Sequence, residues 1–370
     1  MSANQLGVYK EAIRNFLGPV VPLLEDPTVT EILVNGHQEV FVERAGKLER
    51  TNVKFVDEDA LRAAVNNIAQ SVGRRVTVDE PQLDARLPDG SRIHAVLPPC
   101  SRKGTTLSIR KFTQSNMSFK DYIKLGAMTS DAAQFLDLSM FLGKNILVSG
   151  GTGSGKTTLL GLLCSRIPNG QRIIVIEDAT ELTIHYEHVV FFETKMADAQ
   201  GRGEVSIRDL VKSSLRLRPD RIIVGEVRGA EALELIQAMN TGHKGCLGTI
   251  HANAAHDALV RLEALALGSD AKISEKALQY QIASAIDLIV QVSRYQDGSR
   301  RIATIAEVRG FDPQGNYEVV PIFDIPQMVR GPDGRLHGQL EPTGERPRFM
   351  QEIIDNRIPF PESKFQRRSA

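Results

Sequence analysis

A glycine-rich stretch at residues 150–158 has the residue types and spacing of a phosphate-binding loop. The pattern G-x-x-x-x-G-K-[ST] lies between an apolar run at residues 146–148 and helix formers at residues 159–163, the strand–loop–helix context that this motif requires. Glycines allow backbone N–H groups to turn inward around phosphate oxygens, and the following helix start adds partial positive charge. The predicted nucleotide-binding residues are Gly150, Gly151, Thr152, Gly153, Ser154, Gly155, Lys156, Thr157 and Thr158.

Three side chains of this loop, called the P-loop below, have distinct expected roles. Lys156 is expected to reach the β- and γ-phosphates, Thr157 to offer its hydroxyl to Mg²⁺, and Thr158 to add a phosphate contact. The alternative is a Gly/Ser turn without a ligand, which the match in both pattern and context disfavours. The sequence therefore predicts a site for a nucleoside triphosphate with Mg²⁺.

Two further apolar runs end in carboxylates. Glu177 and Asp178 follow the run at residues 173–176, and either could orient a water for attack on the γ-phosphate, because ligands of open α/β sheets sit beyond the strand ends. The alternative is that they cap the next turn, which is weaker for Glu177. Glu226 ends another run, where nucleotide motors place a carboxylate for Mg²⁺. Gly225 stands where many ATPases carry Asp, so contact of Glu226 with the metal through water is favoured over direct contact.

Two histidines, His243 and His251, flank the apolar run at residues 247–250. Isolated histidines at strand ends are more often structural than catalytic. The position of His251, after the second apolar strand that follows Glu226, suits a sensor that hydrogen-bonds the γ-phosphate.

Apolar runs alternating with helical stretches must position these residues. The runs at residues 144–149, 172–177, 221–226, 246–251 and 287–292 are nearly continuous in Ile, Val and Leu. Such strands, separated by helices, are typical of a parallel sheet covered on both faces. Residues 300–325 are expected to form a further strand pair.

The first part of the chain has a different pattern. A meander, a helix and a hairpin around Pro88-Asp89-Gly90 predict a smaller α+β domain. We therefore expect an N-terminal helix or cap at residues 1–20, within a helical pattern over residues 5–24, the α+β domain at 21–111, a linker at 112–125, an α/β ATPase domain at 126–325 and an extended tail at 326–370.

Composition narrows the class of protein. The 370 residues carry 45 basic and 45 acidic side chains, and this balance gives no reason to expect a nucleic-acid partner. The three cysteines are far apart, which favours a reducing cytosol over a zinc or redox motif. No apolar run approaches the roughly 18 residues of a membrane span, so any link to a membrane is expected through partners.

Four blocks in this order resemble the bacterial secretion ATPase superfamily of type II and type IV secretion and pilus assembly. They are the P-loop, residues 176–182, residues 215–229, and residues 242–253, which resemble its Walker A, Asp box, Walker B and His box. Residues 83–92 and 108–112 are most similar to the CpaF family of Flp/Tad pilus motors. The resemblance runs from about residue 20 to residue 325.

The resemblance implies a RecA-like ATPase with ATP and Mg²⁺, assembled as a homohexamer of two-domain subunits. Glu177 would be the catalytic base, Glu226 would support Mg²⁺ and the water, and His251 would sense the γ-phosphate. Arg92 and Arg110 match N-terminal arginines that reach the phosphates in relatives. The protein would be cytoplasmic and peripheral at the inner membrane, bound to a platform protein there. The absence of a four-cysteine zinc insertion disfavours the type II branch but does not separate pilus assembly from conjugative or effector secretion.

Two other functions share the P-loop. A RecA-like nucleic-acid motor should show a basic channel with interleaved aromatics, whereas aromatics here are 5% of residues and there is no Trp. A nucleotide-dependent scaffold that does not turn over would be expected to lack an acid in one of the two acidic blocks, yet Glu177 and Glu226 are both present.

Overall fold

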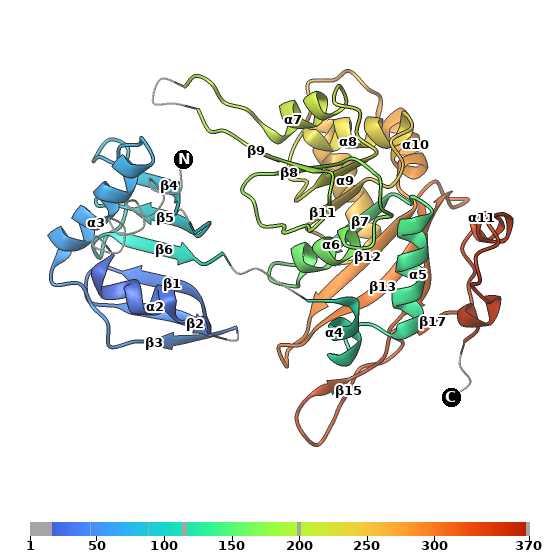
Figure 1. Ribbon diagram of the computed structural model, residues 1–370, viewed down its shortest axis with the longest axis horizontal. Helices are drawn as coiled ribbons and strands as arrows, with labels where there is room; N and C mark the ends of the chain where they lie inside the picture. Colours follow the sequence, from blue (N-terminus) through green and yellow to red (C-terminus); the bar gives the residue numbers. More distant parts are fainter. Residues whose placement is uncertain (1–16, 45, 88, 113–116, 198–200, 368–370) are drawn as a thin grey trace. The chain divides into compact units, whose positions relative to one another are not determined.

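The chain forms two compact units, which divide between Gln114 and Ser115 (Figure 1). The computed structural model describes residues 17–44, 46–87, 89–112, 117–197 and 201–367. The N-terminal unit has one hydrophobic core, and the second unit has two, one on each face of its sheet.

The N-terminal unit is a six-stranded antiparallel sheet covered by one long helix. Its strand order is β3-β2-β1-β6-β5-β4. The helix α3 (Glu58–Ser71) begins at Asp57, whose side chain accepts a hydrogen bond from the Ala60 N–H, and its apolar stripe joins the core of this unit. The other elements are η1 (Gly18–Val20), α2 (Val21–Glu25), β1 (Val29–Asn35), β2 (Val40–Arg44), β3 (Lys47–Arg50), β4 (Gln82–Arg86), β5 (Arg92–Val96) and β6 (Thr106–Arg110).

The second unit is built on a nine-stranded sheet of order β17-β14-β13-β12-β7-β11-β10-β8-β9. Six strands, from β12 to β9, pair in parallel, and β13, β14 and β17 extend the sheet in antiparallel fashion. The five predicted apolar runs form β7 (Ile146–Gly150), β8 (Ile173–Glu177), β10 (Arg221–Val224), β11 (Leu247–Ile250) and β12 (Leu288–Arg294). The remaining strands are β9 (Val189–Glu193), β13 (Arg300–Phe311), β14 (Tyr317–Asp324) and β17 (Glu341–Pro342). The predicted mostly parallel α/β fold and the strand pair at residues 300–325 are confirmed.

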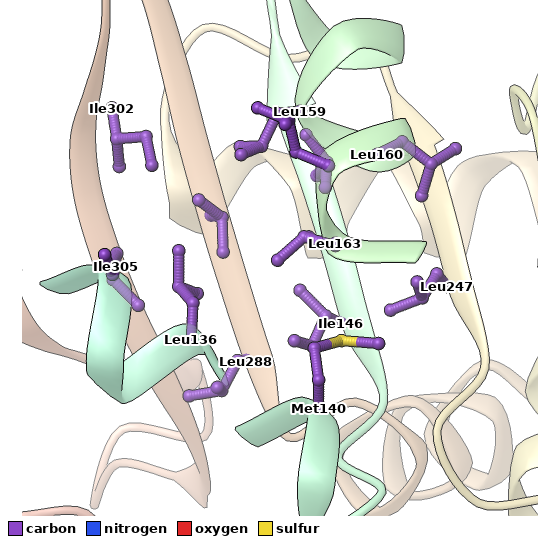
Figure 2. Close-up of a cluster of buried hydrophobic side chains, with 14 of the residues drawn as sticks. Leu136, Met140, Ile146, Leu159, Leu160, Leu163, Leu247, Leu288, Ile302 and Ile305 are labelled. Atoms are coloured by element: carbon purple, nitrogen blue, oxygen red, sulfur yellow. The ribbon is translucent and has the colours of Figure 1, made fainter. Parts of the chain in front are cut away.

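Helices cover both faces of this sheet. Alternate residues of the central strands enter two cores: Ile146 and Val148 pack with α5 (Ser130–Phe141) and α6 (Lys156–Cys164), and Leu147 packs on the opposite face. Figure 2 shows the first core, where Leu136 and Met140 of α5 meet leucines of α6 over the strands. The opposite face carries α7 (Ile207–Ser214), α8 (Glu231–Asn240), α9 (Ala255–Leu267) and α10 (Glu275–Ala285).

The tail expected at residues 326–370, with residues 331–348 as an extended tail or edge arm, has regular structure over its described part, residues 326–367, and β17 lies at the edge of the sheet. Those residues form a hairpin of β15 (Val329–Arg330) and β16 (Leu336–His337), the edge strand β17, the helix α11 (Met350–Asp355) and η2 (Glu362–Phe365). The Phe349 and Phe365 rings lie 5.8 and 5.7 Å from the Phe135 ring of α5, within the first core. The apolar residues of this segment are sparse and are separated by Gly, Pro and charged residues. They recur with neither helical nor strand spacing, so the sequence does not predict these elements.

The expected linker at residues 112–125 is also partly structured. Its second half is the helix α4 (Phe119–Lys124), which begins with a reciprocal hydrogen-bond pair between Ser118 and Asp121 and buries Tyr122 in the first core. Residues 113–116 lie outside the described residues, as does most of the helix expected over residues 5–24. Across the parts of the chain that the structure describes, no helix combines the length and apolar character needed to span a bilayer.

Candidate nucleotide-binding site

The P-loop connects β7 to α6, as its sequence context predicts. A Cβ at Gly150 would lie 2.4 Å from the Val292 carbonyl oxygen, so only glycine fits beside β12. Gly153 and Gly155 have φ values of 68° and 100°, in the left-handed region that favours glycine. Gly151, Thr152 and Gly153 are exposed, whereas Ser154 and Lys156 are buried. The loop therefore presents its backbone at the end of the central strand and the start of a helix.

The Lys156 side chain is hydrogen-bonded to the first residues of the P-loop. Its Nζ donates hydrogen bonds to the carbonyl oxygens of Gly150 and Gly151, at 3.1 and 3.0 Å. The same Nζ lies 3.4 Å from Nδ1 of His251. Burial lowers the pKa of the Lys156 ammonium, and the nearby Glu226 carboxylate opposes this effect. The lysine thus joins the P-loop to residues at the ends of β10 and β11.

Glu226 and His251 meet beside this lysine. His251 Nε2 lies 2.6 Å from Glu226 Oε1, but without hydrogen-bond alignment, and Oε1 has no hydrogen-bond partner among the described residues. The other oxygen, Oε2, accepts a hydrogen bond from Arg228, whose guanidinium also donates to Asp178 at 3.4 Å. Burial, reinforced by the Lys156 ammonium, lowers the pKa of His251, whereas the Glu226 carboxylate opposes this effect.

These residues fit a nucleotide with Mg²⁺. Three buried oxygens at the loop and the neighbouring strand end have no hydrogen-bond partner within the described residues: Ser149 Oγ, Ser154 Oγ and Glu226 Oε1. Buried polar atoms are rarely left unpaired, so they mark a place where a polar ligand completes the site. Thr157 lies half-buried in the first turn of α6. One carboxylate and one hydroxyl suit Mg²⁺, which keeps several waters and takes further oxygens from phosphates.

Glu177 occupies the end of β8, next to β10. Its buried carboxylate accepts hydrogen bonds from the backbone N–H groups of Glu181 and Leu182, at 3.0 and 3.1 Å, so it also anchors the following loop. A Cβ at Gly225 would lie 2.8 Å from Glu177 Cγ. Gly225 is therefore the residue that makes room for Glu177, which explains why Asp cannot stand at this position.

Arg92 and Arg110 lie in the N-terminal unit. They are directly opposite each other on β5 and β6, and Arg86 of β4 is directly opposite Arg92. On its other side Arg110 lies opposite Glu31 of β1, so the row holds three neighbouring arginines followed by a carboxylate. Guanidinium groups bind carboxylates and phosphates well, so the three arginines are of a kind suited to an anion. Arg86 is not among the residues that the sequence predicts for the site, although its mirror position to Arg92 across the hairpin turn is a signal for it.

Two other arginines, for which the sequence predicts no role, lie near the P-loop. Arg228 bridges Glu226 and Asp178, and its signal was its place two residues after Glu226. Arg300 Nε donates to the Gly153 carbonyl oxygen at 2.9 Å. No local pattern reveals Arg300, because its position depends on β12 lying beside β7. The described side-chain contact of His243 is with α8 and not with the P-loop residues: its Nδ1 lies 3.3 Å from the Ala238 carbonyl oxygen.

Comparison with known proteins agrees with this geometry. The chain is 37% identical over 330 residues to a putative conjugal transfer protein of Mycobacterium tuberculosis, covering 87% of this chain and 92% of that protein. It is 33% identical over 342 residues to the type IV secretion system protein VirB11 of Brucella suis, covering 84% and 93%. The crystal structure of the Legionella pneumophila ATPase DotB shares the fold, with a TM-score of 0.56 at 19% identity over 81% of this chain and 82% of that one.

A profile of the family described as type II/IV secretion system protein matches residues 14–314. Since this match covers most of the chain and both units, the protein belongs to the type II/IV secretion system family of ATPases.

Proposed function

We propose that this chain is the hexameric motor of a membrane-bound secretion or pilus machine, in which ATP hydrolysis moves the N-terminal unit. The observation that carries the proposal is the meeting of Lys156, Glu226 and His251 at the P-loop. Lys156 comes from the start of α6, and Glu226 and His251 come from the segments that follow β10 and β11. They are of the kinds that bind, hydrolyse and sense a triphosphate.

Each residue has a defined part in this proposal. The P-loop amides and Lys156 bind the phosphates, while Thr157 and Glu226 hold Mg²⁺, which neutralises the charge that develops on the phosphates. Glu177 orients the attacking water, and its two backbone N–H donors fix the carboxylate for this role. His251, next to Lys156, hydrogen-bonds the γ-phosphate and loses this bond after hydrolysis.

The arginine row supplies the proposed link to movement. We propose that Arg92 and Arg110, with Arg86 beside them, grip phosphate oxygens through their guanidinium groups, in the same subunit or in a neighbouring one. Loss of the γ-phosphate would then release the N-terminal unit. The partner of this movement would be an inner-membrane platform protein, with the ATPase itself on the cytoplasmic side.

Two machines are candidates. The similarity of residues 83–92 and 108–112 to CpaF-type motors supports Flp/Tad pilus assembly. The relatives named as conjugal transfer proteins and VirB11 support a conjugative or other type IV secretion system instead.

The biochemical test is phosphate release by the purified full-length chain. Wild type should turn over ATP without DNA and should sediment as a hexamer with an ATP analogue, whereas Lys156→Ala should remain folded and lose turnover because a phosphate-neutralising charge is gone. Turnover that requires DNA would support the nucleic-acid motor.

The cellular test uses a Lys156→Ala strain. Loss of surface fibres in electron micrographs would support pilus assembly, and loss of plasmid transfer would support conjugation. A strain that keeps both, together with normal protein secretion, would contradict the proposed machine.

A further inference from the structure

Arg300 contacts the outer side of the P-loop. Besides the hydrogen bond from its Nε to the Gly153 carbonyl oxygen, its Cδ lies 3.6 Å from the position that a Cβ of Gly155 would take. The Tyr122 hydroxyl oxygen lies at the same distance from that position, so the arginine stem and the tyrosine border the loop together. Arg300 is the first residue of β13, directly after the turn at residues 295–299 that joins β12 to β13.

The contacted carbonyl controls the direction of an N–H group. The carbonyl of Gly153 and the N–H of Ser154 belong to one planar peptide unit and point in opposite directions. Fixing the carbonyl toward Arg300 therefore directs the Ser154 N–H to the inner side of the loop. That N–H now makes a long bond of 3.4 Å to the Gly151 carbonyl oxygen, which a phosphate oxygen could replace. A charged donor on the carbonyl also polarises the peptide and strengthens its N–H as a donor.

The turn that carries Arg300 is itself held by residues 326–338, called the C-terminal arm. Asp297 accepts hydrogen bonds from Ser299 within the turn and, through Oδ2, from the Leu336 N–H of the arm at 2.8 Å. Arg301 donates in the other direction, to the carbonyl oxygens of Leu336 and Gly338 at 2.5 and 2.9 Å. The C-terminal arm is therefore hydrogen-bonded to residues on both sides of Arg300 in the sequence, Asp297 before it and Arg301 after it.

We propose that Arg300 is a positioning residue that keeps the P-loop in its phosphate-binding conformation, and that the C-terminal arm keeps Arg300 in place. The proposal rests on nucleotide binding at the P-loop and is independent of the machine that the ATPase serves. The C-terminal arm begins more than 160 residues after the P-loop. In this proposal it nevertheless contributes to the affinity of the P-loop for ATP.

The first test measures binding of a fluorescent ATP analogue to the full chain. Arg300→Ala should weaken binding about tenfold, the usual effect of losing one charge-assisted hydrogen bond. KM should rise by a similar factor while kcat at saturation changes little, and the melting temperature without nucleotide should stay at the wild-type value because Arg300 is exposed. Arg300→Lys, which keeps a charged donor, should recover part of the loss. The matched control is Arg335→Ala, an exposed arm residue outside the hydrogen bonds described above.

The second test separates the arm from the arginine. Arg301→Ala and Asp297→Asn should each weaken binding less than Arg300→Ala does, and the double variant Arg300→Ala/Arg301→Ala should bind no more weakly than Arg300→Ala alone, because both changes act through one contact. Wild-type binding by Arg300→Ala would overturn the positioning role. Independent, multiplying effects of Arg300 and Arg301 would overturn the link to the arm.

Discussion

Replacing Gly225 by alanine should uncouple hydrolysis from nucleotide binding. The new Cβ would lie 2.8 Å from Glu177 Cγ and 3.3 Å from its Oε1. Ordinary contacts between carbon atoms are about 3.5–4.0 Å, so the Glu177 side chain must move by about 1 Å. This carboxylate is 4% exposed and is fixed by two backbone hydrogen bonds, so it cannot move without weakening them.

The size of the effect follows from these contacts. Overpacking in a filled interior lowers the free energy of unfolding by about 1–3 kcal/mol. The smaller conformational freedom of alanine in the unfolded chain raises it by about 0.4–1 kcal/mol. A net loss of about 1–2 kcal/mol should lower the melting temperature by roughly 2–8 °C in a unit of this size. If Glu177 orients the attacking water, a displacement of about 1 Å should lower kcat about 100-fold.

The assay compares phosphate release, binding of a fluorescent ATP analogue and thermal melting. Gly225→Ala should bind the analogue with nearly wild-type affinity, since the P-loop is unchanged, and should hydrolyse ATP poorly. The matched control is Gly161→Ala in α6, where the new Cβ meets only Leu182 Cδ2 at 3.6 Å and alanine favours the helix by about 1 kcal/mol. Wild-type turnover by Gly225→Ala, with the expected fall in melting temperature, would refute the role of Glu177 in catalysis.

Three further predictions test other parts of the reasoning. Glu177→Gln should bind ATP·Mg²⁺ about as well as wild type and hydrolyse it poorly, whereas Glu226→Gln should shift the Mg²⁺ dependence of turnover; identical Mg²⁺ titrations of the two variants would reject this division of roles. Arg110→Ala should lower ATPase activity and Arg110→Lys should restore it only in part, because a point charge lacks the guanidinium fork; full activity of Arg110→Ala in phosphate release would remove it from the site. Gly245→Ala should destabilise the fold by more than about 3 kcal/mol in chemical denaturation, because its Cβ would lie 1.4 Å from the buried Arg221 guanidinium; a stable variant would contradict the packing.

The sequence by itself determined the features that depend on neighbouring residues. The P-loop is contiguous, and its flanking strand and helix patterns are local, so residues 150–158 could be assigned from the order of their residues alone. The five apolar runs of the parallel sheet were recognisable because strands buried on both faces are apolar throughout. The same reasoning selected Glu177, Glu226 and His251 as candidate site residues, because each stands at the end of such a run.

The tertiary structure decided what depends on strand order and on contacts between distant residues. β12 lies beside β7 although its first residue, Leu288, comes 138 positions after Gly150, the last residue of β7, and this pairing brings Arg300 to Gly153. The space that Gly225 leaves for Glu177 exists only because β8 and β10 are adjacent. The aromatic side chains of residues 349–365 pack on α5 without any local period. In each of these cases the role of a residue depends on a contact with a residue far away in the sequence. A short stretch of sequence does not show which distant residues will be in contact.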